Sequence, residues 1–261
     1  MEVIIRPTTE VATNLAAQLV ANKVREKPFL CLGLATGRTM EMVYDKLVDI
    51  YNTEGLDFSL IRTYNLDEYI GLPPEDHNSY RHYMNKHLFN KINIDLRNTH
   101  LPLGMAENLN LECILYEKSI SHSGGIDLQV LGIGRSGHIG FNEPLSALQS
   151  RTRDKALTPV TVAQNSPMFD PPESMPKRAI TMGVGTILDA KQIIMLVTGK
   201  EKAKILTQAV EGPISSMISA TALQLHPNCT VIVDEDAATE LQCCEYYNWI
   251  FENEPKWEPY R

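Results

Sequence analysis

The chain has 261 residues, which is enough for one large α/β domain or two small ones. Hydrophobic residues make up 43% of the chain and charged residues 21%, as in ordinary soluble globular proteins. The net charge of −8 argues against a nucleic-acid groove and against an anionic-membrane surface, because both need a basic face.

The cysteines and the N-terminus favour a cytoplasmic protein. The five cysteines form no CxxC pair, and the adjacent Cys243 and Cys244 suit neither an ordinary disulfide nor a zinc site. We therefore expect reduced thiols. The first seven residues lack the layout of a signal peptide, and no apolar run approaches the length that spans a membrane.

Strand and helix patterns alternate from one end of the chain to the other. Apolar runs predict strands at residues 3–5, 28–35, 61–66, 99–103, 126–130, 179–183, 192–197 and 230–234. Helical spacing is found at residues 8–20, 39–50, 79–88, 110–119 and 237–252. No repeat or linker divides the chain. The pattern therefore predicts a single α/β domain over residues 1–261, with a mostly parallel, Rossmann-like sheet flanked by helices.

The second predicted strand leads into a polar turn made of Thr36, Gly37, Arg38 and Thr39, and a helix pattern follows. This order of elements points backbone N–H groups at an anion. The turn lacks the lysine of a Walker loop and the three glycines of a dinucleotide fingerprint, so an ordinary turn with a helix cap is the alternative. Arg38 favours a phosphate site, because a guanidinium can add a bidentate contact.

Two carboxylates, Asp67 and Glu68, directly follow the third predicted strand. Enzymes with α/β folds place catalytic groups at this edge of the sheet. The alternative is that Asp67 caps the next element while Glu68 is a solvated charge. The histidines that come next, His77, His82 and His87, share no metal-binding spacing, and we interpret them as surface or packing residues.

Residues 131–144 form the stretch around which the chain is organised. They follow a buried strand pattern and contain four glycines within nine residues, which suits a loop at a strand end beside a ligand. The loop also carries an imidazole, His138, and a carboxylate, Glu143, which are common partners for moving a proton near neutral pH. We therefore predict that this is the active-site loop.

The second half of the chain holds four further features. Residues 150–155 are a compact basic cluster, which is either a solvated turn or a second anion site. Residues 164–176 contain four prolines, so we expect no regular helix there but a mobile segment over the pocket. Residues 198–203 repeat the strand–glycine–helix turn, now with two lysines. The aromatic helix pattern at residues 237–252 favours core packing or a subunit contact.

Several of these stretches resemble the glucosamine-6-phosphate deaminase family, whose members are aldose–ketose isomerases that also release ammonia. The matches follow the family's order and cover nearly the whole chain, at residues 32–39, 63–72, 134–144, 150–153 and 181–186. The combination of Leu-Asp-Glu-Tyr at 66–69 with Gly-His-Ile-Gly-Phe-Asn-Glu-Pro at 137–144 is highly specific. The resemblance implies conversion of glucosamine 6-phosphate and water to fructose 6-phosphate and ammonia, in amino-sugar catabolism, with no metal or organic cofactor.

The resemblance also implies roles for the residues of the two loops. Asp67 would take the C2 proton of the open-chain sugar and return it at C1. His138 would open the pyranose ring by proton transfer with the ring oxygen, and Glu143 would orient the imidazole. These roles agree with the chemistry, since a partly buried carboxylate can remove a proton beside an aldehyde, and imidazole both accepts and donates near neutrality. The 36–39 turn and Lys202 would hold the sugar phosphate.

The chain departs from the best-known members of this family at two positions. Ser136 stands where an aspartate is often found, so Glu143 must contribute more to orienting the histidine. Pro167 stands where a phosphate-binding arginine commonly follows Asn165 and Ser166. We expect Arg38 to take over that phosphate contact.

The basic cluster matches a regulatory site of the family. Some bacterial members are hexamers activated by N-acetylglucosamine 6-phosphate between subunits, and Ser146, Arg153 and Lys155 match the polar residues of that site. The resemblance therefore implies a homo-oligomer, a hexamer among the options, with an amino-sugar phosphate as substrate and this activator as a second ligand. Neither nucleic acid nor membrane is expected as a partner.

Three other functions remain open from the sequence. A galactosamine-6-phosphate isomerase would differ only in the configuration of the sugar at C4. A 6-phosphogluconolactonase shares the fold and a Gly-His loop, although residues 141–144 and 67–69 favour the deaminase. A non-catalytic sugar-phosphate sensor would need the phosphate turn but not Asp67, His138 and Glu143 together.

Overall fold

A seven-stranded parallel sheet forms the centre of the computed structural model, which describes residues 1–261. The strand order is β1-β10-β9-β6-β2-β3-β5. The strands are β1 (Glu2–Arg6), β2 (Cys31–Leu34), β3 (Arg62–Asn65), β5 (Thr99–His100), β6 (Leu128–Leu131), β9 (Ile193–Val197) and β10 (Cys229–Asp234). The predicted α/β fold with a mostly parallel sheet flanked by helices is confirmed, and each apolar run predicted for this sheet overlaps one of these strands.

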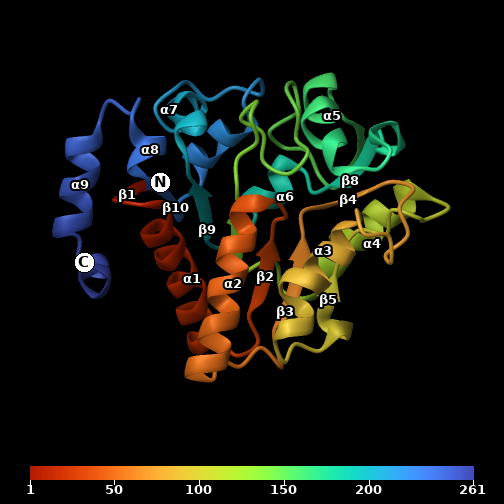
Figure 1. Cartoon of the computed structure of the whole chain (residues 1–261), viewed down its shortest axis with the longest axis horizontal. Coiled ribbons are helices and arrows are strands. Elements are labelled where there is room, and N and C mark those ends of the chain that lie inside the picture. Colours follow the sequence, from red (N-terminus) through yellow and green to blue (C-terminus); the bar gives the residue numbers. More distant parts are fainter.

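Nine α-helices connect and cover the strands (Figure 1). They are α1 (Thr9–Glu26), α2 (Arg38–Glu54), α3 (Tyr80–His87), α4 (Leu109–His122), α5 (Pro159–Asn165), α6 (Val184–Leu188), α7 (Ala203–Val210), α8 (Glu235–Ala238) and α9 (Cys244–Asn253). Local signals set the helix ends: Thr8 caps α1 by accepting the N–H of Val11, and Gly55 ends α2 with a φ of 67°. Figure 1 shows α1 and α2 packed side by side on one face of the sheet.

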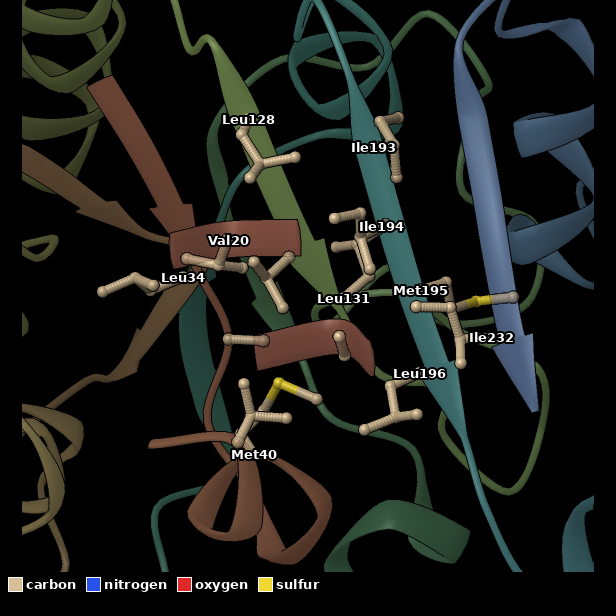
Figure 2. Packing of buried hydrophobic residues seen from close by; sticks show 14 of the residues in the cluster. Val20, Leu34, Met40, Leu128, Leu131, Ile193, Ile194, Met195, Leu196 and Ile232 are labelled. Carbon is tan, nitrogen blue, oxygen red and sulfur yellow. The ribbon is translucent and has the colours of Figure 1, made fainter. Parts of the chain in front are cut away.

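The core lies between this sheet and its helices. All five residues of β9 are buried, as a parallel sheet covered on both faces requires. Figure 2 shows side chains of β6, β9 and β10, such as Leu131, Ile194 and Ile232, beside Val20 of α1 and Met40 of α2. A single cluster of 57 buried apolar residues joins these elements, so the sheet and both helix layers share one core.

A second, smaller sheet lies beside the first and contains β4 (Asp67–Tyr69), β8 (Arg178–Thr181) and β7 (Arg153–Ala156), paired antiparallel in that order. The predicted strand at 179–183 forms, but it belongs to this separate sheet. The interpretation of 150–155 as a solvated turn is wrong, because its second half is β7. Two 3₁₀ turns follow α5 within 164–176, so the prediction that this segment forms no regular helix holds beyond Asn165.

The predicted C-terminal helix at 237–252 is wrong in its extent, because it is broken into α8 and α9. The Glu211 carboxylate accepts hydrogen bonds from the backbone N–H groups of Gln242 and Cys243, and these bonds hold the chain in a turn. All five cysteines are free thiols. None of the helices combines the length and the apolar character that crossing a membrane would need.

Candidate active site

The candidate site lies at the carboxyl edge of the central sheet. The chain passes from β2 through β3 to β5 on one side of β2, and then crosses to β6, β9 and β10 on the other side. The order therefore reverses between β2 and β6, which is where open α/β sheets bind ligands. The loops that follow β3, β2, β6 and β9 stand next to one another at this edge, and they carry Asp67, the 36–39 turn, His138 and Lys202.

The 36–39 turn opens the long helix α2. Gly37 is the residue before the helix, and its φ of 121° is a conformation that favours glycine. No side chain caps α2, and the N–H groups of Met40 and Glu41 bond to the carbonyl of Gly37, so those of Arg38 and Thr39 are left to face an anion. The hydroxyl of Tyr83 donates to the carbonyl of Gly37 at 2.8 Å and fixes the turn. Arg38 is exposed, while Thr36 and Thr39 are half-buried.

Asp67 is the first residue of β4 and is only 6% exposed. Burial, and then the charge of Glu68, raise the pKa of Asp67 to about 8. The active-site loop passes closely against this carboxyl group: a methyl group placed on Gly140 would lie 2.9 Å from Thr181 Oγ1 and 3.4 Å from Asp67 Oδ2. Asp67 and the loop that carries His138 therefore line the same space.

Glu68 is buried and does not have the solvated position that was one alternative for it. Its Oε1 accepts from the N–H groups of Tyr69 and Tyr80, and its Oε2 accepts from the N–H of Arg81, each at 2.9 Å. Two of these donors belong to the first turn of α3, so Glu68 ties the end of β4 to that helix. The sequence did not reveal this role, because it depends on a helix start twelve residues away.

His138 is held by two residues of its own loop. Its Nδ1 lies 2.7 Å from Ser136 Oγ and 3.4 Å from Glu143 Oε2. The ring packs directly over Gly134, where a methyl group would lie 2.1 Å from Nε2. Nδ1 is therefore occupied by orienting groups, and Nε2 is the nitrogen left for chemistry.

Glu143 is buried, and its other oxygen is also fixed. Its Oε1 accepts from the hydroxyl of Thr158 at 3.2 Å. Burial alone would raise the pKa of Glu143, but the neighbouring side chains of His138 and Thr161 outweigh it and hold the pKa at about 2. The group is thus a permanent anion beside the imidazole. Thr158 had no predicted role, although the Thr158-Pro159 pair is a recognisable helix start.

Lys202 lies in the short turn η5 (Lys200–Lys202) after β9 and reaches the active-site loop. Its Nζ donates to the carbonyl of Ile133 at 2.8 Å. Burial lowers the pKa of Lys202, the charge of Glu201 acts against this, and the charge of Arg135 acts with it. Arg135 is exposed in the loop and had no predicted role, since its position among glycines gave no sign of what it faces.

The residues of the predicted regulatory site are partly brought together. The Arg153 guanidinium donates to Ser146 Oγ at 3.0 Å and to Asn142 Oδ1 at 2.9 Å. It therefore joins β7 to the end of the active-site loop. Lys155 lies two residues further along β7, on the same side of the strand, and forms no ion pair. The structure contains no group of three His, Cys, Asp or Glu side chains arranged to hold a metal ion.

Known proteins resemble the chain over nearly its whole length. The sequence profile of a family described as glucosamine-6-phosphate isomerases/6-phosphogluconolactonase matches residues 7–232. A glucosamine-6-phosphate deaminase of Hahella chejuensis is 48% identical over 250 residues, covering 96% of this chain and 95% of that one. Another, of Thermoanaerobacter pseudethanolicus, is 45% identical over 239 residues, covering 92% and 94%.

Solved structures agree with these matches. A structure described as a monomeric glucosamine-6-phosphate deaminase superposes with a TM-score of 0.90 at 43% identity, covering 92% of this chain and 100% of that one. A 6-phosphogluconolactonase from Trypanosoma cruzi reaches a TM-score of 0.72 at 19% identity, covering 93% and 97%, and so shares the fold. By its profile match and by its full-length relatives, the chain belongs to the glucosamine-6-phosphate isomerase/6-phosphogluconolactonase family.

Proposed function

We propose that this protein is a glucosamine-6-phosphate deaminase, which converts glucosamine 6-phosphate and water to fructose 6-phosphate and ammonia. The observation that carries the proposal is the pairing of a buried base, Asp67, whose pKa is raised to about 8, with an imidazole oriented by a buried carboxylate at the same sheet edge. Relatives with that name match this chain at 42–48% identity over nearly its full length.

We assign ring opening to His138. An imidazole can take the proton of the C1 hydroxyl and deliver it to the ring oxygen, so the pyranose opens to the aldehyde without any net change in charge. Nε2 would carry this proton, because Nδ1 faces Ser136 and Glu143. The Glu143 carboxylate stabilises the imidazolium that exists between the two transfers.

We assign isomerisation to Asp67. Its carboxylate removes the proton from C2, and the electron pair forms the C1–C2 double bond as O1 takes a proton from the substrate's own 2-ammonium group. Asp67 then returns its proton to C1, which gives the protonated 2-imine of fructose 6-phosphate. Water adds to C2 and ammonia leaves, so the atoms balance. A pKa near 8 suits this work, since the base is strong and still partly ionised at neutral pH.

The phosphate group would supply the binding energy that positions C1 and C2. We assign it to the N–H groups at the start of α2, supported by the side chains of Thr36, Arg38 and Thr39, and to Lys202 across the switch point. Arg135 joins this set, because it is an exposed cation two residues after Ile133, whose carbonyl Lys202 contacts, and it forms no ion pair of its own.

The proposal extends to regulation by an anion and to the oligomeric state. Arg153 contacts the active-site loop through Asn142 and Ser146, so an anion that drew Arg153 and Lys155 together would act directly on that loop. Activation by N-acetylglucosamine 6-phosphate tests this idea, and loss of the response in Lys155→Ala would support it. One related deaminase is described as monomeric. Light scattering of the purified protein is therefore needed to measure its oligomeric state.

Ammonia release from glucosamine 6-phosphate, measured beside galactosamine 6-phosphate, tests the main proposal. Fast release from the gluco sugar, abolished in Asp67→Asn, is the expected result. Preference for the galacto sugar would move the protein to the sister activity. Absence of ammonia from either sugar would overturn the proposal in favour of a lactonase, or of a sensor if the sugars raise the melting temperature without turnover.

A further inference from the structure

A second concentration of positive charge lies away from the candidate active site. A surface groove of about 490 Å³ runs between the start of β3, the edge strand β5 and the second half of α4, elements that lie together in Figure 1. Five of its ten lining residues are basic: Arg62, Arg97, His100, Lys118 and His122. We call this the cationic groove.

The charge of the cationic groove is not neutralised within it. None of its ten lining residues is aspartate or glutamate, although the whole chain carries a net charge of −8. Arg97 forms an ion pair with the nearby Asp95, but Arg62 and Lys118 form none. Burial lowers the pKa of His100, and the charges of Arg81 and Arg62 act in the same direction. Unpaired cations that face one hollow from two parts of the chain are suited to a multivalent anion.

The floor of the cationic groove is rigid. The Tyr64 hydroxyl is within hydrogen-bond distance of Ser119 Oγ at 2.7 Å and Ser123 Oγ at 2.8 Å, and it donates to the Ser119 carbonyl. The His100 ring stacks on the Tyr64 ring, with 4.6 Å between the centroids. β3 and α4 are therefore fixed to each other beneath the basic side chains, so a ligand would meet a shaped surface.

The cationic groove is separate from the catalytic edge but is connected to it. Arg62 begins β3 and Asp67 follows its end, so they lie about 16 Å apart at roughly 3.3 Å per residue. The connection is α4, because its Tyr116 donates to the carbonyl of Asn65 at 2.7 Å. A helix that walls the groove is thus bonded to the backbone two residues before the proposed base.

We propose that the cationic groove is an effector site for a small molecule that carries two or more phosphoryl charges. Arginine and lysine together recognise phosphate oxygens, and the volume of the groove suits a small phosphorylated compound. Binding would draw Lys118 of α4 toward Arg62 of β3. Through Tyr116 this would shift the position of Asp67.

Calorimetric titration with inorganic pyrophosphate tests the binding part, which does not depend on the proposed enzyme activity. Saturating fructose 6-phosphate keeps the probe out of the candidate active site. We expect Arg62→Gln/Lys118→Gln to weaken pyrophosphate binding at least tenfold. The control Arg25→Gln/Lys46→Gln removes the same charge from surface positions on α1 and α2 and should change pyrophosphate binding less than twofold. Orthophosphate and ADP, as further arms, show whether two phosphoryl groups suffice or an organic part is needed.

Three outcomes decide the matter. If pyrophosphate binding weakens equally in both double variants, or changes in neither, the cationic groove is not the binding site. The effector role is tested by measuring turnover at saturating substrate. Pyrophosphate should change kcat at least twofold in the unmodified protein and leave kcat unaltered in Arg62→Gln/Lys118→Gln. Binding at the groove without any change in kcat would overturn the effector role.

Discussion

Removing the charge of Glu68 is expected to move the acidic limb of the pH–rate profile to lower pH. Asp67 and Glu68 are consecutive and both buried. Burial raises the pKa of Glu68, and three backbone N–H donors partly offset this by favouring its charged form. Neighbouring residues of a strand point to opposite faces, so their carboxylates are on the order of 8 Å apart. At an effective dielectric of about 20, the repulsion is about 2 kcal/mol, or between one and two pKa units at Asp67.

The consequence for rate follows from the ionised fraction of the base. With the pKa of Asp67 at about 8, only about 3% of the base is ionised at pH 6.5. If Glu68→Gln lowers this pKa by about one unit, the fraction rises to about 24%, and kcat at pH 6.5 rises roughly eightfold. Above pH 9 the variant should be the slower enzyme, because a weaker base removes the C2 proton less readily.

The assay is ammonia release from pH 5.5 to 10, with substrate deuterated at C2 to confirm that proton removal limits the rate. Glu75→Gln changes an exposed carboxylate in the loop after β4 and serves as the control, whose profile should not move. Thermal unfolding establishes that the Glu68 variant is folded, since glutamine can accept only part of the bonds that the carboxylate accepts. An unmoved acidic limb in a folded variant would refute the electrostatic coupling of the two carboxylates.

Three further predictions concern the other residues of the site. Glu143→Gln should lower kcat about a hundredfold, because the imidazolium loses its anion, whereas Ser136→Ala should lower it less than tenfold; similar losses would show that the hydroxyl, and not the charge, orients His138. Asp67→Asn should stabilise the fold more at pH 9 than at pH 5, because the raised pKa of Asp67 contributes stability at low pH that is lost as the pH rises through about 8. Circular-dichroism melts measure this, and a gain in Tm that does not grow with pH would contradict it. Arg38→Ala should raise KM at least tenfold and change kcat less than threefold, with Arg25→Ala as the surface control; an unchanged KM would remove Arg38 from the phosphate site.

Much of the fold could be predicted because its signals are local. The strands of the parallel sheet are apolar on both faces, so β9 and β10 were recognisable from short runs alone. The 36–39 turn and the loop around His138 were recognisable because glycines follow strands there. Such loops gather at one edge of a parallel sheet, and this geometry made the neighbourhood of Asp67 and His138 predictable without any knowledge of distances.

What could not be predicted depends on contacts between distant parts of the chain. The pairing of β4 with β8 joins residues more than a hundred positions apart, and neither strand has an apolar run that reveals its partner. The break between α8 and α9 depends on Glu211, which lies some thirty residues before the backbone groups that it binds. Arg153 shows the same limit, since the resemblance grouped it with Ser146 but gave no sign of its bond to Asn142.

The two buried carboxylates of the candidate site are tuned in opposite directions, and we expect this division to set the pH dependence of the proposed reaction. Asp67 has no cation beside it, so burial and Glu68 raise its pKa to about 8, where it can exchange protons with the substrate. Glu143 faces His138 and Thr158, and its pKa is held at about 2, so it stays charged at any pH where the enzyme works. Loss of activity on acidification between pH 8 and 6 is therefore expected from protonation of Asp67 and not of Glu143. In a Glu143→Gln variant, the acidic limb of the pH–rate profile should stay at the pH that Asp67 sets, and only the maximal kcat should fall.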